Sequence, residues 1–276
     1  GYSVVTSIGR EHLEFFCDMT GVVEEESSLA RLLPANGTLF VNCESEWMKQ
    51  ITEQTRAKVV RIGFSEKSDF VARNVRLDET GVTFLVTAPR ENLNGDYRIN
   101  LLGRHQVLNA LLAIAVAERF GLGRAEIQRG LTEAQPAKMR LQIWNCHGAQ
   151  VLDDSYNANA DSMLAALQTL RDLPCAGRRA AVLGDMAEVG EHSASAHAEV
   201  GKNAAELGVK KLFAVGKMAA EIANGARQAG LKKIIELAEV DSAALAVKEF
   251  LKPGDLVLLK ASRAMRLERV GEFLKK

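Results

Sequence analysis

The sequence predicts an α/β protein whose second half forms a doubly wound, mainly parallel sheet. Short apolar segments alternate with amphipathic helical segments after residue 142, and some of them, such as Leu256–Leu259, are apolar throughout. Polar motifs follow several of these segments directly. Strands that alternate with helices form parallel sheets, and strands buried on both faces read as continuous apolar runs. A chain of 276 residues also has room for two domains.

The first half is predicted to be richer in strands. We predict strands at 3–8, 38–42, 58–63, 70–77, 82–87 and 97–101, and helices at 46–54, 107–120 and 125–133. The segment Asp78–Gly81 has turn composition, so the strands around it should form a hairpin. Periodicity is lost around Pro136, and we place two domains at 1–141 and 142–276.

The second half contains five strand–helix pairs. The predicted strands are 150–153, 180–183, 211–215, 234–237 and 256–259, followed in turn by helices 162–170, 194–207, 219–228, 242–250 and 265–274. In open parallel sheets, ligands bind beyond the carboxyl ends of the strands. The residues directly after each strand are therefore the first candidates for chemistry.

Composition excludes several classes of partner. Lys plus Arg equals Asp plus Glu at 35 each, so no overall field favours nucleic acid or an anionic membrane. No apolar segment reaches the ~18 residues that a membrane helix needs. The four cysteines form no C-x-x-C pair, which is typical of reduced thiols in a cytoplasmic protein.

Three strand-end motifs carry polar side chains. In Asp153–Ser162 a carboxylate can accept the ribose hydroxyls of a nucleotide, and Asp161 is a candidate helix cap. Gly184–Ser193 combines glycines with acids, and Lys260–Arg263 places two cations at a helix start, which suits an anion. Each motif can also be a solvated polar turn without a ligand.

Two motifs of the first half are weaker signals. Gly103–Asn109 opens the long helix, and Asn109 lies among apolar residues, where a buried amide needs partners and could read a base edge. His12 precedes the acidic run Glu24–Glu26, and a histidine with carboxylates can bind a divalent metal. A solvated acidic surface is the other interpretation of this run.

In this order the motifs resemble those of the Mur ligases, which are ATP-dependent amide ligases of bacterial cell-wall synthesis. The resemblance rests on Thr6–Glu14, Leu33–Gly37, Gly103–Ala110, Asp153–Met163, Gly184–Glu188 and Lys260–Arg263. It is closest to the branch that joins D-alanyl-D-alanine to a UDP-N-acetylmuramoyl-tripeptide through an acyl phosphate. It implies the later part of a central ATPase domain followed by a complete Rossmann-like C-terminal domain. The N-terminal domain and the phosphate loop G-x-x-G-K-[ST] are not found in this sequence.

The resemblance also implies roles for individual residues. Catalytic roles fall on Arg140, which would meet the γ-phosphate, and on Lys260. The nucleotide is expected to contact His105, Asn109, Arg140, Asp154, Tyr156 and Asn157. Substrate contacts are expected from Asn159, Glu188, Ser262 and Arg263, and contacts to Mg²⁺ from His12 and Glu26.

The sequence departs from the family pattern at several positions. Glu26 stands where the family usually has a carbamylated lysine, and we expect its carboxylate to take over at the Mg²⁺ site. Met139 and Ala261 stand where the family has glycine, which puts the local backbone geometry in question.

Two other functions stay open: a non-catalytic module that binds nucleotide or peptide, and an amide ligase of the folylpolyglutamate synthetase type. Because no phosphate loop is found, we expect this chain by itself to be inactive. The resemblance implies a monomer that uses ATP and Mg²⁺. The third residue of the peptide substrate is not indicated.

Overall fold

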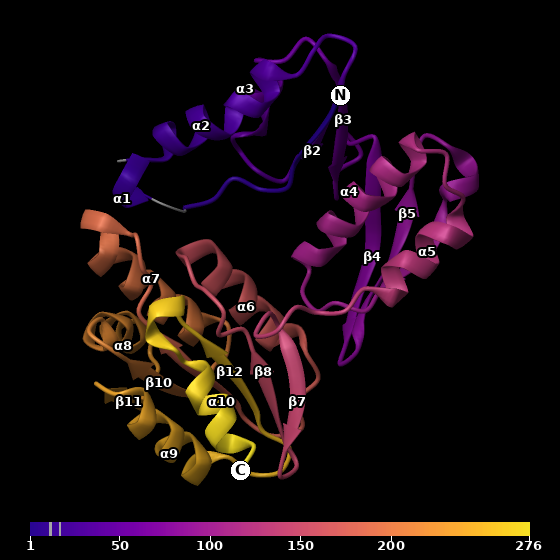
Figure 1. Cartoon of the computed structure of the whole chain (residues 1–276). Coiled ribbons are helices and arrows are strands. Elements are labelled where there is room, and N and C mark those ends of the chain that lie inside the picture. The colour runs from indigo at the N-terminus through magenta and orange to yellow at the C-terminus, as the bar shows by residue number, and fades with distance from the viewer. Residues whose placement is uncertain (11–12, 17) are drawn as a thin grey trace. The chain divides into compact units, whose positions relative to one another are not determined.

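The computed structural model describes residues 1–10, 13–16 and 18–276. The described chain divides into two compact units, Gly1–Gln135 and Pro136–Lys276, and each has its own sheet with flanking helices (Figure 1). The division falls a few residues before the boundary that the sequence suggested after residue 141.

The first unit is built on a six-stranded sheet in chain order, with β1 to β4 parallel and β4 to β6 antiparallel. Its strands are β1 (Tyr2–Val5), β2 (Thr38–Asn42), β3 (Lys58–Gly63), β4 (Phe70–Asp78), β5 (Gly81–Thr87) and β6 (Gly95–Ile99). Its helices are α1 (Leu13–Phe16), α2 (Met19–Leu32), α3 (Met48–Thr52), α4 (His105–Arg119) and α5 (Arg124–Glu133), with a 3₁₀ turn η1 at Glu91–Leu93.

Strand β2 shows how this unit is packed. Every residue of β2 is buried. Phe40 packs into a core with α4 and α5, while Leu39 and Val41 pack into a second core with α2 and α3. Because successive side chains point to opposite faces of a strand, an apolar run places the sheet between two helical layers.

Helix α2 has no counterpart among the predicted elements. It begins at Asp18, whose side chain accepts the N–H of Gly21 at 3.1 Å. Val22, Val23 and Ala30 are buried, while the acidic run Glu24–Glu26 is exposed. That run therefore lies on the solvent face of an amphipathic helix.

The second unit confirms the predicted doubly wound sheet. Its strands are β7 (Gln142–Cys146), β8 (Ala149–Asp153), β9 (Arg179–Gly184), β10 (Lys211–Val215), β11 (Ile234–Leu237) and β12 (Leu256–Lys260). Its helices are α6 (Ala160–Asp172), α7 (Ser193–Glu206), α8 (Ala219–Gln228), α9 (Val240–Phe250) and α10 (Glu268–Leu274), with 3₁₀ turns η2 (Gly190–His192) and η3 (Arg263–Met265).

The strand order β11-β10-β9-β12-β8-β7 is parallel except for β7, which pairs antiparallel with β8. Helices α9 and α10 pack with the sheet in one apolar core. Helix α7 contacts both α6 and α8, and these two helices contact β12 and β10, respectively (Figure 1). The carboxyl ends of β8, β12 and β9 are neighbours, so the three polar motifs of this half meet at one edge. No helix in the described ranges has both the length and the apolar character needed to cross a membrane.

Candidate active site

The three strand-end motifs of the second unit are tied together by backbone hydrogen bonds. Asp154 N–H donates to the carbonyl of Leu259 at 3.0 Å, and Ser262 N–H donates to the carbonyl of Asp185 at 2.9 Å. Segments that are far apart in the sequence therefore form one continuous polar edge.

The turn after β8 is shaped by Asp153, which is buried. Its Oδ1 accepts the hydroxyl of Ser155 at 2.5 Å and the N–H of Ser155 at 3.2 Å. Burial raises the pKa of Asp153 above its ordinary value, although the hydrogen bonds from Ser155 oppose this. Asp153 therefore has a structural role, closing the turn that presents Asp154.

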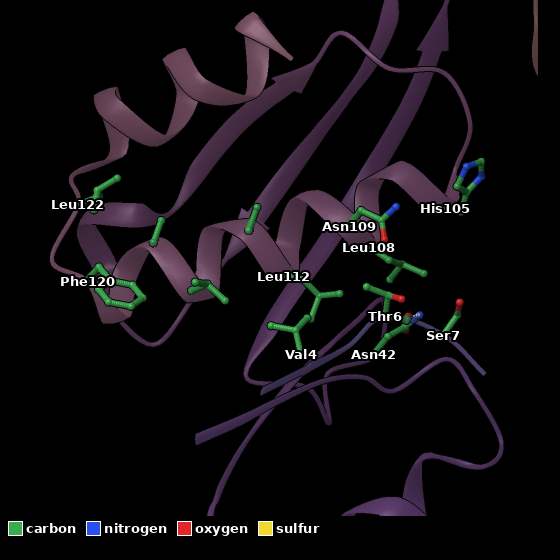
Figure 2. A pocket seen from close by; sticks show the side chains of 13 residues that line it. Val4, Thr6, Ser7, Asn42, His105, Leu108, Asn109, Leu112, Phe120 and Leu122 are labelled. Carbon is green, nitrogen blue, oxygen red and sulfur yellow. Dashed lines mark hydrogen bonds between the residues drawn. The ribbon is translucent and has the colours of Figure 1, made fainter. Parts of the chain in front are cut away.

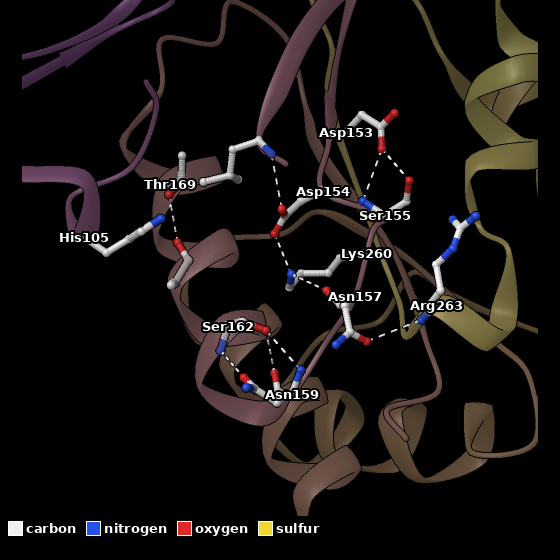
Figure 3. A network of polar contacts seen from close by, with 12 residues as sticks. His105, Asp153, Asp154, Ser155, Asn157, Asn159, Ser162, Thr169, Lys260 and Arg263 are labelled. Carbon is white, nitrogen blue, oxygen red and sulfur yellow. Dashed lines mark hydrogen bonds and ion pairs between the residues drawn. The ribbon is translucent and has the colours of Figure 1, made fainter. Parts of the chain in front are cut away.

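Asp154 and Lys260 form an ion pair at the centre of the edge. Lys260 Nζ lies 2.5 Å from Asp154 Oδ2 and 3.0 Å from the carbonyl oxygen of Asn157, and the two side chains are 2% and 14% exposed. Burial lowers the pKa of Lys260 and raises the pKa of Asp154, and in each case it outweighs the attraction of the partner. The ammonium group is thus directed into the protein (Figure 3).

The other oxygen of Asp154 holds the segment 139–141. Asp154 Oδ1 accepts the N–H of Leu141 at 3.2 Å, and the carbonyl of Met139 accepts the N–H of Tyr156 at 3.1 Å. Met139 and Leu141 both have positive φ, 60° and 47°. Met139 therefore adopts the left-handed conformation that glycine would take more easily.

Two guanidinium groups approach the ring of Tyr156, which is 42% exposed. The Cζ of Arg140 lies 4.3 Å from the ring centroid and that of Arg263 lies 6.0 Å from it. The backbone N–H of Arg263 donates to Asn157 Oδ1 at 3.4 Å, and its guanidinium pairs with Glu268 at 3.0 Å. Two arginines on one exposed ring suit an anionic ligand such as a phosphate or a carboxylate.

The loop after β9 is anchored by Asp185. Its carboxylate accepts the N–H groups of Lys217 and Met218 at 3.0 and 2.9 Å. Gly184 leaves room for the neighbouring strand end, since a Cβ there would lie 2.8 Å from the Cβ of Ala261. Beyond this anchor, Glu188 is exposed and has a φ of 59°.

The helix cap of α6 differs from the prediction. Asn159, not Asp161, is the N-cap: its side chain accepts the N–H of Ser162 at 2.7 Å, while Asn159 N–H donates to Ser162 Oγ at 3.0 Å. An amide at this position satisfies the open N–H groups of the first turn, and Asp161 lies inside that turn. Ser262 is buried at the end of β12. Contacts of Asn159 and Ser262 with substrate stay predictions.

The first unit has a pocket of about 760 Å³ beside α4 (Figure 2). Its polar end contains Thr6, Ser7, Asn42, His105 and Asn109, and its apolar part contains Val4, Leu108, Leu112, Ala113, Val116, Ala117, Phe120 and Leu122. Asn109 is exposed rather than buried, which corrects the expectation of a buried amide. Its Nδ2 donates to Gln106 Oε1 at 3.0 Å, and Asn109 is one of the residues that line the pocket.

The predicted metal ligands do not form a complete site in the described part of the chain. Glu26 is exposed on α2, and His12 lies outside the described residues. Within the ranges that the structure describes, no three His, Cys, Asp or Glu side chains gather as metal ligands would. The role of Glu26 in a Mg²⁺ site stays a prediction.

Sequence reasoning missed the backbone carbonyl of Met139 and the backbone N–H of Leu141, because backbone donors and acceptors leave no signature in the residue type. One indirect signal was available. Met139, which precedes the predicted site residue Arg140, stands where the family has glycine, and this indicates an unusual backbone conformation.

Comparisons with known proteins match both units. The signature described as the Mur ligase middle domain matches residues 1–117, and that described as Mur ligase, glutamate ligase domain matches residues 139–263. The chain is 33% identical, over 297 aligned residues, to the UDP-N-acetylmuramoyl-tripeptide–D-alanyl-D-alanine ligase of Mycobacterium tuberculosis. The alignment covers 98% of this chain and 57% of that protein, so the chain spans little more than half of its relative.

Two solved structures are similar along the whole chain. A crystal structure of MurF from Acinetobacter baumannii superposes with a TM-score of 0.88 at 26% identity, covering 100% of this chain and 60% of that one. MurF from Thermotoga maritima, in complex with ADP, has a TM-score of 0.85 at 23% identity, covering 99% and 61% of the two chains. The second likeness shows the fold alone.

Proposed function

We propose, from the premise that this chain belongs to the Mur ligase family, that the whole protein is an ATP-dependent ligase of peptidoglycan precursor synthesis. It joins D-alanyl-D-alanine to the UDP-N-acetylmuramoyl-tripeptide, in the cytoplasm and as a monomer. The observation that carries the proposal is the polar edge where Asp154, Lys260 and Arg263 meet. The similarity to tripeptide–D-alanyl-D-alanine ligases along nearly the whole chain supports it.

The proposed reaction has two steps. The γ-phosphoryl group of ATP passes to the terminal carboxylate of the tripeptide, and ADP leaves. The dipeptide ammonium group first gives one proton to solvent, and the neutral amine attacks the acyl carbon. The C–O bond to phosphate then breaks, phosphate leaves, and the nitrogen loses a second proton to solvent or to the departing phosphate as the amide forms. In the second unit, Arg140 would offset the charge on the phosphoryl oxygens, and a guanidinium held against Tyr156 is well prepared for this.

The ribose is assigned to Asp154 and the adenine to Asn109, with His105 beside it. An ionised carboxylate offers about four lone-pair sites, and Leu141 and Lys260 use two of those on Asp154. Hydroxyl donors can therefore still bind it. The pocket beside α4, about 760 Å³, is in the size range of cofactor sites.

The substrate contacts are assigned by charge. Arg263 suits the carboxylate end of the dipeptide and Glu188 its ammonium end, with Asn159 and Ser262 at the same edge. Asn157 remains assigned to the nucleotide. Lys260 was predicted to be catalytic. Because its ammonium group is buried against Asp154 and Asn157, we propose that it is a positioning residue.

Mg²⁺ would supply charge compensation for the phosphoryl step. The described residues fit only part of such a site. Of the two predicted metal ligands, Glu26 lies among the described residues and His12 does not. In the whole protein, Glu26→Gln should raise the Mg²⁺ concentration needed for half-maximal rate, and an unchanged Mg²⁺ dependence contradicts the assignment.

The two alternative functions lead to different results in one experiment. The coding sequence around this chain is read for an in-frame G-x-x-G-K-[ST] motif, and the whole protein is then assayed for phosphate release. We expect release that requires both the UDP-linked tripeptide and D-alanyl-D-alanine. A missing motif or absent turnover favours a non-catalytic module, and turnover with a folate and glutamate favours the folylpolyglutamate type.

Two controls sharpen this assay. The isolated 276-residue chain should release no phosphate in response to D-alanyl-D-alanine, and release by it contradicts our expectation. Asp154→Asn should weaken ATP binding by the whole protein, whereas Asp241→Asn, an exposed Asp on α9 paired with Arg269, should leave it unchanged.

A further inference from the structure

His197 is a completely buried histidine on α7, with 0% of its surface exposed, and none of the roles assigned above uses it. Its Nε2 lies 2.8 Å from the backbone nitrogen of Met186, and its Nδ1 lies 2.7 Å from the carbonyl oxygen of Ser193. A backbone N–H can only donate and a carbonyl can only accept. The geometry therefore requires the neutral imidazole with its proton on Nδ1.

The bond to Met186 completes the anchoring of the loop after β9. The Asp185 carboxylate binds the turn before α8, and the Asp185 carbonyl binds Ser262 at the end of β12. His197 adds a third contact, from α7, to the next residue along the chain. Two successive residues of the loop are thus fixed to three separate elements.

This anchoring bears on Glu188, which follows two residues later. Glu188 has a φ of 59°, a conformation that is uncommon for residues other than glycine and has to be held by its surroundings. It is exposed at the edge where β9 and β12 are adjacent strands. The contact from His197 adds to the Asp185 anchor in fixing the backbone that leads to Glu188.

We propose that His197 is a positioning residue, which as a neutral Nδ1–H imidazole holds the loop 185–188 so that Glu188 meets the ammonium group of the incoming dipeptide. The choice of ligand rests on the proposed function. The tautomer and the loop contact do not depend on it, because they follow from the two distances alone.

The first test uses the 276-residue chain labelled with ¹⁵N. Long-range ¹H–¹⁵N correlations should show His197 with a protonated Nδ1 and an unprotonated Nε2, assigned by the loss of these signals in His197→Gln. A proton on Nε2, or on both nitrogens, at neutral pH overturns the proposal.

The second test measures hydrogen exchange at the Met186 amide. In His197→Leu this amide should exchange roughly five- to tenfold faster, the size expected for one lost neutral hydrogen bond. In His197→Gln the side-chain carbonyl can still accept the bond, and protection should largely return. His147→Asn is the matched control, because His147 is exposed in a turn with a φ of 49°, which Asn tolerates. Unchanged exchange in His197→Leu contradicts the proposal.

The third test separates positioning from general stability in the whole protein. His197→Leu should raise KM for D-alanyl-D-alanine at least threefold and leave KM for ATP unchanged, with His197→Gln close to the parent protein. Equal changes in both KM values mean a merely structural role and overturn the proposal. If the parent protein shows no dipeptide-dependent phosphate release, the proposed function fails, while the first two tests still decide the role of His197 in the loop.

Discussion

Removing the ammonium group of Lys260 should strongly destabilise the second unit, and removing both partners of its ion pair should cost less than the two single removals added together. The Nζ–Oδ2 separation from Asp154 is 2.5 Å, so at an effective dielectric constant of ~20 the attraction is about 7 kcal/mol. Burying each ion costs several kcal/mol, so the intact pair contributes little net stability. The raised pKa of Asp154 and the lowered pKa of Lys260 are consistent with this small net contribution, because burial outweighs the attraction of the partner for each group.

Lys260→Met leaves a buried carboxylate without its partner and should cost about 3–5 kcal/mol. Asp154→Asn should also destabilise the unit, because it leaves the buried ammonium group of Lys260 without its charged partner. The new amide carbonyl can still accept the N–H of Leu141. In the double variant both charges are gone. Its cost should therefore be smaller than the sum of the single costs by about 2–3 kcal/mol.

The assay is urea unfolding followed by the fluorescence of Trp144. The chain has two tryptophans, Trp47 in the first unit and Trp144 on β7 in the second. A Trp47→Phe background isolates the second unit, which avoids treating two domains as one transition. The reasoning is refuted by a Lys260→Met cost below about 1 kcal/mol, or by single costs that add within about 0.5 kcal/mol.

Three further predictions concern other contacts of the second unit. Burial tends to raise the pKa of Asp255, but hydrogen bonds from Arg178 and neighbouring backbone groups outweigh it and hold the pKa below its ordinary value. The free energy of unfolding should then decrease as the pH falls below about 4 and through the folded-state pKa of Asp255. In this range the urea midpoint of Asp255→Asn should depend less steeply on pH than that of the parent protein. Asn159→Ala should cost about 1 kcal/mol in the same assay while Asn159→Asp costs little, and equal losses contradict the capping argument. Tyr156→Leu should weaken ATP binding to the whole protein about two- to fivefold by releasing Arg140, and Tyr156→Phe should not; calorimetry that finds the two variants alike rules this out.

Continuous apolar strands were the most predictable part of the fold. The observed bounds of β2 and β10 equal the predicted ones, because strands buried on both faces are mostly apolar. The bounds of β3 and β11 also equal the predicted ones, although both strands contain a charged residue and are partly exposed. Strand β7 was missed. It is an edge strand whose residues are mostly half-buried, and it pairs with β8. Edge pairing depends on the neighbouring strand and leaves a weak local pattern.

The candidate site also has one part that the sequence predicted and another part that it could not predict. The sequence placed Asp154 and Lys260 at strand ends, because a polar residue directly after an apolar run is a local signal. It could not show that they face each other, since they are 106 residues apart and pair only through the order of β8 and β12. The burial of His197 has the same origin, because it depends on contacts with the loop after β9 rather than on its helix alone.

These contacts explain how Arg140 can be an effective anion ligand although it follows directly on the segment between the two units. The residues on either side of it, Met139 and Leu141, are left-handed and bonded to Tyr156 and Asp154. The guanidinium lies against the ring of Tyr156. A side chain fixed at its backbone and at its end loses little further freedom when an anion binds, so less of the binding energy is spent on ordering it. In the function we propose, Asp154 would therefore act on the phosphates as well as on the ribose, because the carboxylate that can accept sugar hydroxyls also fixes the backbone that carries the arginine.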